Sequence, residues 1–466
     1  MQPLEEVLLQ DASSLLQFVS SISDLCARKS ETFAHRVASE RFFAYIEDLA
    51  NATSRHLEIS LRTTKTRELL QLRREIALLR VGWRFLHEFV KPALDADTLN
   101  LPTALVQGLS TRFHEIAQFR TTEFVFFHVD RFNYLNVTLS EFKKRASQIS
   151  RCVVGPEFPP KLSIIGIPYS QSSSLFMNCL IPHEMGHYVF GELSLATKLK
   201  AVVEKELRSR LGRRRKPWVG VLVERITRWL EELFCDAFAV RLVGLCFSAA
   251  FVELFDLARY LDEKGALSKG RTGGETEFAE YPPDLLRLRQ QYRRLDTDKW
   301  WTAIKAHPTD AHYISAIRST KGLQDSHFHF NALRRDHNID PTPILDTFFA
   351  VLPQIDSELD SATQGLESCA SKWANQTETI ESYLAQGVVP SSLCGQPGSE
   401  PWTPDITCLL NSAYRFYMLR MTDLLSRITD ATASDIAQRV YWARRVESWT
   451  AKAIEDLLLV RRQEPR

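Results

Sequence analysis

Hydrophobic residues recur at helical spacing through the first 115 residues of the chain. In the segment 57–90, apolar side chains fall on one helical stripe, and arginine and glutamate side chains fall on the opposite face. The stripe comprises Leu69, Leu70, Leu72, Ile76, Leu79, Trp83 and Leu86. This pattern predicts a helix with one solvated face in a helical bundle, and the alternative is a helix that binds a partner.

The hydrophobic pattern changes between residues 119 and 170. The segments 123–129 and 161–169 are short, rich in aromatic and β-branched residues, and bounded by proline or glycine. Such segments are typical of strands, so the sequence predicts a small sheet here. Helical spacing returns over residues 173–259.

Two irregular segments divide the remaining helical pattern. Residues 262–283 are rich in glycine and charge, and residues 387–404 are rich in proline and glycine, so both are predicted to be loops. The helical pattern continues to the end of the chain. We therefore expect an α+β fold that is predominantly helical, with an N-terminal helical region (1–115), a central domain (116–320) and a C-terminal helical region (321–466).

Composition narrows the class of protein. The 466 residues include 58 Lys and Arg against 57 Asp and Glu, and 44% of residues are hydrophobic. This content predicts a globular chain, and the near-zero net charge argues against a nucleic-acid-binding protein. No segment reaches the ~18 apolar residues of a transmembrane helix, and the acidic N-terminus does not resemble a signal peptide. Eight cysteines without a C-x-x-C pair indicate reduced thiols, so we expect a soluble cytoplasmic protein; its oligomeric state stays open.

The residues with the clearest chemistry form the sequence His-Glu-Met-Gly-His at 183–187. On a helix, His183 and His187 lie four residues apart, so both imidazoles project from one face and can bind one zinc ion. Glu184 lies beside them, where a carboxylate can take a proton from a metal-bound water. A catalytic zinc usually has three protein ligands, so a third ligand is expected elsewhere in the chain.

The sequence WLEELFCDAFA at 229–239 offers the third ligand. Glu232 and Asp236 share one helix face at i,i+4 spacing. Glu232 is the predicted zinc ligand, and Asp236 is predicted to accept the free N–H of a ligating histidine. Glu231 is the alternative shifted by one residue, but at i,i+4 spacing it pairs with Cys235 rather than with a carboxylate.

These two motifs resemble the gluzincin metallopeptidases, in particular the branch similar to CAAX prenyl proteases. The second motif of that branch is Glu-x-x-x-Asp-x-x-Ala, which Glu232, Asp236 and Ala239 match. The resemblance covers roughly residues 160–320 and does not include the membrane helices of the family. It implies a zincin-like core in the central domain.

The family also carries a later His-Pro-Pro-x-x-x-Arg motif that helps to stabilise the oxyanion of the transition state. Here Tyr281 stands in the place of the histidine, and Arg287 follows at the right spacing. A second candidate, His307, precedes a proline but has Tyr313 where the arginine is expected. Tyr281 with Arg287, or alternatively His307, is therefore expected to stabilise the oxyanion.

Three local features bear on the predicted site. Pro182 either lies in the first turn of the zinc helix or bends that helix. Gly186 lacks a side chain and can allow close packing behind the zinc. In zincins a strand before this helix pairs with extended substrate, and residues 162–169 are the candidate for that strand.

Together these features predict a soluble zinc-dependent endopeptidase. One Zn²⁺ per chain is held by His183, His187 and Glu232, and Glu184 acts as the general base. The substrate is a protein or peptide, and the long helical flanks favour narrow specificity. The alternative is a catalytically inactive, zinc-containing scaffold.

Overall fold

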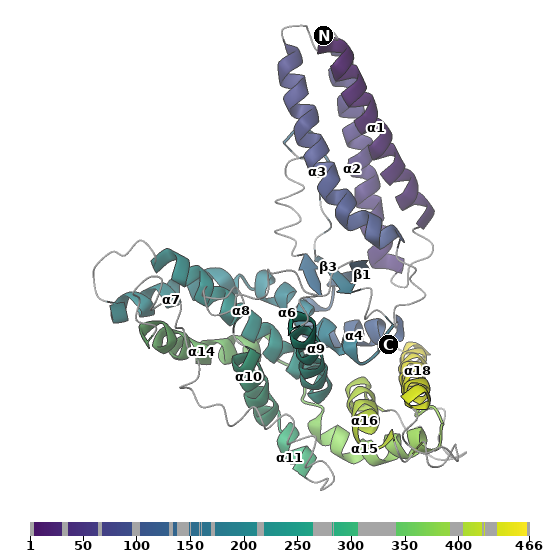
Figure 1. The fold of residues 1–466 in the computed structure, drawn as a ribbon, viewed down its shortest axis with the longest axis vertical. Helices are drawn as coiled ribbons and strands as arrows, with labels where there is room; N and C mark the ends of the chain where they lie inside the picture. The colour runs from purple at the N-terminus through teal and green to yellow at the C-terminus, as the bar shows by residue number, and fades with distance from the viewer. Residues whose placement is uncertain are drawn as a thin grey trace. The chain divides into compact units, whose positions relative to one another are not determined.

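A computed structural model gives the structure of the chain. It describes residues 4–29, 36–63, 68–95, 103–129, 134–137, 149, 151–157, 159, 161–168, 173–211, 219–263, 282, 284–305, 342–391, 404–421, 424 and 436–463. Over these residues the fold is predominantly helical with one small sheet, as the sequence predicted (Figure 1). None of the helices described is both long and apolar enough to cross a membrane.

The chain divides into two compact units. Unit 1 comprises Met1–Thr103 and Thr121–Ser173, and unit 2 comprises Ala104–Arg120 and Ser174–Arg466. The three regions expected from the sequence stay a prediction beside this division by compactness. The three strands lie within unit 1, together with the N-terminal helices.

Unit 1 contains three long helices, α1 (Leu4–Lys29), α2 (Arg36–Thr63) and α3 (Leu69–Asp95) (Figure 1). The apolar pattern over 57–90 is thus divided between two helices, α2 and α3. Hydrophobic residues from all three helices meet in one core, which agrees with the predicted bundle.

The core face of α3 follows the predicted stripe with one exception. Leu72, Ile76, Leu79 and Trp83 are buried, and the indole N–H of Trp83 donates a hydrogen bond to the Thr53 hydroxyl at 3.2 Å. Leu70 is 63% exposed, so its assignment to the buried stripe was wrong. At 100° per residue, Leu70 lies about 160° from Leu72 around the helix, which turns it to the opposite face.

The sheet of unit 1 has three strands, β1 (Glu123–Val129), β2 (Leu135–Val137) and β3 (Leu162–Pro168). Their order is β1-β3-β2, with β1 parallel and β2 antiparallel to β3. Strand β3 is buried along its whole length and is paired on both edges at residues 164–166. A strand paired on both edges has no free backbone groups to offer there, so the expectation that residues 162–169 bind substrate by strand pairing was wrong for this part of β3.

Unit 2 is built from helices. Its elements are α4 (Thr103–Phe113), η3 (Ala117–Phe119), η5 (Met177–Leu180), α6 (Ile181–Glu192), α7 (Leu195–Leu211), α8 (Val219–Val243), α9 (Leu245–Glu263), α10 (Asp284–Thr297), α11 (Trp300–Lys305), α14 (Thr342–Ala362), α15 (Ala370–Ala385), α16 (Ile406–Leu419) and α18 (Ile436–Gln463). Helix α6 packs along α8, and α7, α10 and α14 also contact α8. The Phe113 ring of α4 packs edge-on against Tyr188 of α6 and Phe238 of α8. Helix α8, buried over most of its length, is therefore the centre of this unit.

Two further predictions concern the C-terminal helical pattern and the two irregular segments. Helix α18 agrees with the helical pattern that closes the chain. Most of the two predicted loops, 262–283 and 387–404, lies outside the described residues.

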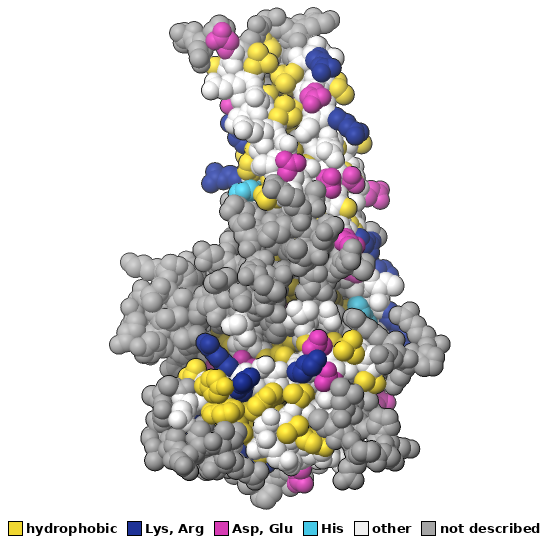
Figure 2. Space-filling view, turned by 90° about the vertical axis from the view of Figure 1, so that its right-hand side faces the viewer, with side chains coloured by type: hydrophobic (Ala, Val, Ile, Leu, Met, Phe, Trp, Pro, Cys, Tyr) yellow, Lys and Arg dark blue, Asp and Glu magenta, His cyan; other side chains and the backbone are white. Residues whose placement is uncertain are grey.

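On the face drawn in Figure 2, hydrophobic side chains are exposed among charged ones. The exposed large hydrophobic residues among those described lie on several different helices, and single exposed hydrophobic residues are normal on a protein surface.

Candidate metal centre

The His-Glu-Met-Gly-His sequence lies in the first half of α6. The 3-10 helix η5 leads directly into α6, whose first turn contains Pro182. Proline is favoured in a first turn because its missing N–H has no partner in the helix at that position. Of the two alternatives for Pro182, the structure therefore shows a helix start rather than a bend. His183 and Glu184 follow immediately and are both buried.

Gly186 brings α6 close to α8. A Cβ atom added at Gly186 would lie 2.8 Å from Cα and 3.1 Å from Cβ of Cys235. Both atoms belong to or adjoin the backbone of α8, which cannot move without shifting the helix. The absence of a side chain at Gly186 thus sets the separation of the two helices that carry the site.

We expect Gly186→Ala to lower the free energy of unfolding by about 1–3 kcal/mol, because the new methyl group overpacks the α6–α8 contact. Gly191 in the same helix is the matched control, since an added Cβ there meets nothing within 4 Å. Gly191→Ala should be neutral or slightly stabilising. Urea unfolding of the two variants tests this difference, and equal stability would contradict the proposed close contact.

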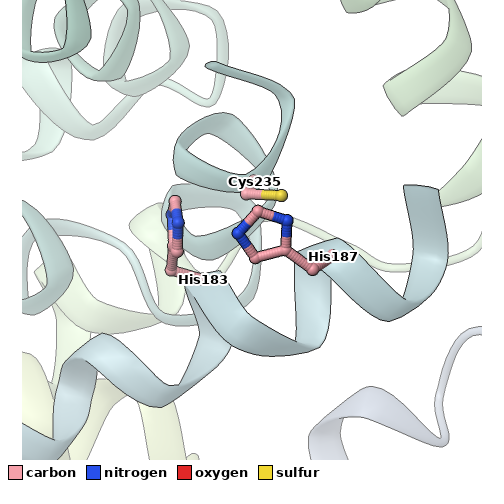
Figure 3. A group of neighbouring side chains, drawn as sticks. All are labelled: His183, His187 and Cys235. Atoms are coloured by element: carbon pink, nitrogen blue, oxygen red, sulfur yellow. The ribbon is translucent and has the colours of Figure 1, made fainter. Parts of the chain in front are cut away.

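One nitrogen of each histidine faces the carboxylate of Glu232. Nε2 of His183 lies 3.3 Å from Oε2 of Glu232, and Nε2 of His187 lies 3.8 Å from Oε1. The two imidazoles come from successive turns of α6, with ring centroids 4.9 Å apart and planes nearly perpendicular (Figure 3). The helices α6 and α8 thus bring together the three residues that the sequence nominated as metal ligands.

The other nitrogen of each ring is bonded to a second carboxylate. Nδ1 of His183 lies 2.8 Å from Oδ1 of Asp236, which is the contact expected from the sequence. Nδ1 of His187 lies 2.9 Å from Oε1 of Glu231. With each Nδ1 occupied by a carboxylate, Nε2 is the ring nitrogen left to a metal, which is the usual arrangement around a metal-binding histidine.

Sequence reasoning missed the place of Glu231 in the site. It was weighed only as a rival of Glu232, whereas the structure gives the two neighbours different partners. Glu232 faces the Nε2 atoms, and Glu231 holds the far side of His187. The available signal was the pair of adjacent glutamates, because a ligating histidine often donates its second N–H to a carboxylate and Asp236 can serve only one of the two rings.

Arg287 of α10 binds the two carboxylates nearest His183. Its Nε and Nη2 donate to Oδ2 and Oδ1 of Asp236 at 2.8 and 2.7 Å, and Nη2 lies 3.3 Å from Oε2 of Glu232. The guanidinium carbon also lies 4.7 Å from the ring centroid of Phe251. These contacts favour a role in holding the carboxylates over the expected role at the oxyanion. Tyr281 and His307, the other oxyanion candidates, lie outside the described residues.

Burial and the neighbouring charges shift the pKa values of the site residues strongly. Burial lowers the pKa of His183, but hydrogen bonds to Asp236 and Glu232 outweigh it and raise this pKa to about 10. Burial likewise lowers the pKa of His187, but the hydrogen bond to Glu231 and the negative charge of Glu232 outweigh it, so this pKa is also raised. Burial raises the pKa of both Glu232 and Asp236, but the Arg287 guanidinium and the histidines outweigh it, so both values fall. Without a metal, the histidines therefore hold protons that a cation would displace.

Zinc affinity should consequently keep rising with pH above neutrality. A raised pKa means that protons compete with the metal up to about pH 10 at His183, whereas ordinary histidines cease to compete near their pKa of about 6.5. Between pH 7 and 8.5 we expect the zinc dissociation constant to fall by up to about tenfold per pH unit for each proton released. Competition with a chromophoric chelator measures this slope, and a plateau above pH 7.5 would contradict it.

Cys235 is the other side chain that could ligate a metal here. Its sulfur and one nitrogen of each histidine lie within 4.8 Å of one another, and Figure 3 shows the three side chains together. Burial raises the pKa of this thiol well above its ordinary value, and the carboxylates around it raise it further. Metals bind the thiolate form of cysteine, whereas Glu232 has a lowered pKa and faces both Nε2 atoms, which favours Glu232 over Cys235 as the candidate third ligand.

Comparisons with known proteins do not supply a family for this chain. No protein-family model, curated protein or solved structure matches it.

Proposed function

We propose that the protein is a zinc-dependent endopeptidase of the gluzincin type, with one zinc ion held by His183, His187 and Glu232. The observation that carries this proposal is the arrangement of the two imidazoles. Both Nε2 atoms face one carboxylate, while both Nδ1 atoms are held by others. A surface helix with two incidental histidines would not need three buried or half-buried carboxylates arranged around them.

The donor set suits zinc. Two imidazole nitrogens and one carboxylate oxygen match the His₂Glu ligands of catalytic zinc sites, which keep a fourth position for water or substrate. When bound, zinc polarises the scissile carbonyl and lowers the pKa of a water molecule toward neutrality.

Glu184 is the proposed general base. It follows His183 directly in the first turn of α6 and is buried. Its negative charge contributes to the raised pKa of His187, so its carboxylate lies within electrostatic range of the centre. In the proposed reaction Glu184 accepts a proton from the attacking water and then delivers it to the leaving amine.

The surrounding residues keep the ligands in place. Arg287 fixes Asp236 by two hydrogen bonds, and Asp236 in turn fixes the ring of His183. Glu231 does the same for His187 from α8. Such partners set the orientation and basicity of ligating histidines, and their loss commonly costs 10–100-fold in metal affinity or activity.

The proposal is tested by exposing a proteome-derived peptide library to the zinc-loaded full chain and sequencing the new termini by mass spectrometry. We expect cleavage within peptides at a restricted set of sequences, loss of cleavage after chelation, and recovery on addition of zinc. Zinc binding without any cleavage would instead support the inactive scaffold, and cleavage that resists complete removal of the metal would overturn the mechanism.

A further inference from the structure

Helix α3 carries hydrophobic residues on two opposite faces. Its inner face, with Ile76 and Trp83, is buried in the core of unit 1. On its outer face Leu70 is 63% exposed and Val81 is 56% exposed. A helix that only covers a bundle core carries one apolar stripe, so the second stripe needs a separate explanation.

The outer residues follow a regular spacing. Leu70, Arg74, Ala77, Val81 and Arg84 succeed one another at intervals of four, three, four and three residues, and all are exposed. This is the 3.5-residue period of a coiled-coil seam, in which two helices meet along a narrow row. The row extends over about 21 Å at 1.5 Å per residue, which is long enough to contact a helix of four turns. We call these five residues the outer row of α3.

The charges along the outer row have one sign. Arg74 lies within the row, Arg84 lies at its end, and exposed Arg73 flanks it. The acidic residue Glu75 is directed elsewhere, toward His56 of α2 at 3.6 Å. A second copy of the chain docked row against row would place arginine against arginine, which is unfavourable on closing an interface.

We propose that the outer row of α3 is a docking site for an amphipathic helix with acidic residues, contributed by a partner protein. Leucine, alanine and valine of the row then pack against apolar residues of the partner, and glutamates or aspartates pair with the arginines. A membrane surface fits less well, because interfacial helices use a broad face with large aromatic and leucine side chains rather than a narrow row with small residues. This inference does not depend on the proposed peptidase activity.

The test uses the full chain and two synthetic helical peptides of about three heptads. Both carry leucine and alanine on one face; one has glutamate along the edges of that face and the other has lysine. We expect fluorescence anisotropy to show that the glutamate peptide binds, and that the lysine peptide does not. Val81→Glu should weaken binding at least tenfold. Ile59→Glu on α2 is the matched control, since Ile59 is 61% exposed and lies outside the row, and it should bind as wild type does.

A charge exchange sharpens the test. Arg74→Glu should weaken binding of the glutamate peptide and allow the lysine peptide to bind. Because these positions are exposed, all variants should keep the circular dichroism and unfolding midpoint of the wild type. Three results would overturn the proposal: no binding of either peptide, equal binding of both, or equal binding to wild type and Val81→Glu. If neither peptide binds, but the wild type binds phosphatidylserine vesicles and Val81→Glu does not, the occupant is a membrane. If neither peptide binds, but the wild type self-associates in sedimentation and Val81→Glu does not, the occupant is a second copy.

Discussion

Replacing Glu184 by glutamine should lower kcat/KM for peptide hydrolysis by about 10²–10⁴-fold while zinc stays bound. Glutamine keeps the size and much of the hydrogen bonding of glutamate, but it cannot accept the proton of the attacking water. The proposed ligands His183, His187 and Glu232 are unchanged, so the metal content should equal that of the wild type. Hydrolysis of a peptide identified in the library screen and elemental analysis of the same sample measure both quantities.

Glu192 provides the control for this variant. It is an exposed residue at the end of the same helix, so Glu192→Gln makes the same chemical change away from the site. It should leave both activity and zinc content unchanged. Full activity of a zinc-loaded Glu184→Gln protein would contradict the proposed role of Glu184.

Arg287→Met should destabilise the metal-free protein by about 3–5 kcal/mol, because it removes the cation that compensates two buried carboxylates. Asp236 loses both hydrogen bonds from the guanidinium, and Glu232 loses its contact at 3.3 Å. A zinc ion supplies positive charge at the same carboxylates, so saturating zinc should restore part of the lost stability. Urea unfolding with and without zinc measures both effects.

Arg293→Met is the matched control on the same helix. Arg293 pairs with Asp356 at 2.9 Å, but 47% of its side chain is exposed. An exposed ion pair contributes only about 0–1 kcal/mol, so this variant should unfold close to wild type. If the two variants are equally stable, the carboxylates at the centre do not depend on Arg287.

Local spacing predicted which candidate residues share a helix face, because each pair lies on one helix. His183 and His187 share a face of α6, and Glu232 and Asp236 share a face of α8, so the i,i+4 rule was sufficient. Spacing does not specify how far each helix is rotated toward the other. For this reason the separate contact of Glu231 with His187 was missed.

Long-range contacts account for the other differences. Arg287 was chosen for its spacing from Tyr281, but its partners, Asp236 and Glu232, lie some 50 residues earlier, and only the packing of α10 on α8 brings them together. Strand β3 was recognised from its composition, yet its central place in the sheet depends on strand order, which no local pattern encodes. Leu70 was grouped with the core by its hydrophobicity, although its angular position turns it outward.

Elemental analysis of the purified protein tests most directly whether His183, His187 and Glu232 hold one zinc ion. Glu232→Ala and its neighbour Glu231→Ala should be prepared in parallel with the wild type. We predict one zinc per chain in the wild type, loss of zinc in Glu232→Ala, and zinc retained at weaker affinity in Glu231→Ala. Absence of zinc from the wild type after reconstitution, or full zinc content in Glu232→Ala, would contradict this set of ligands.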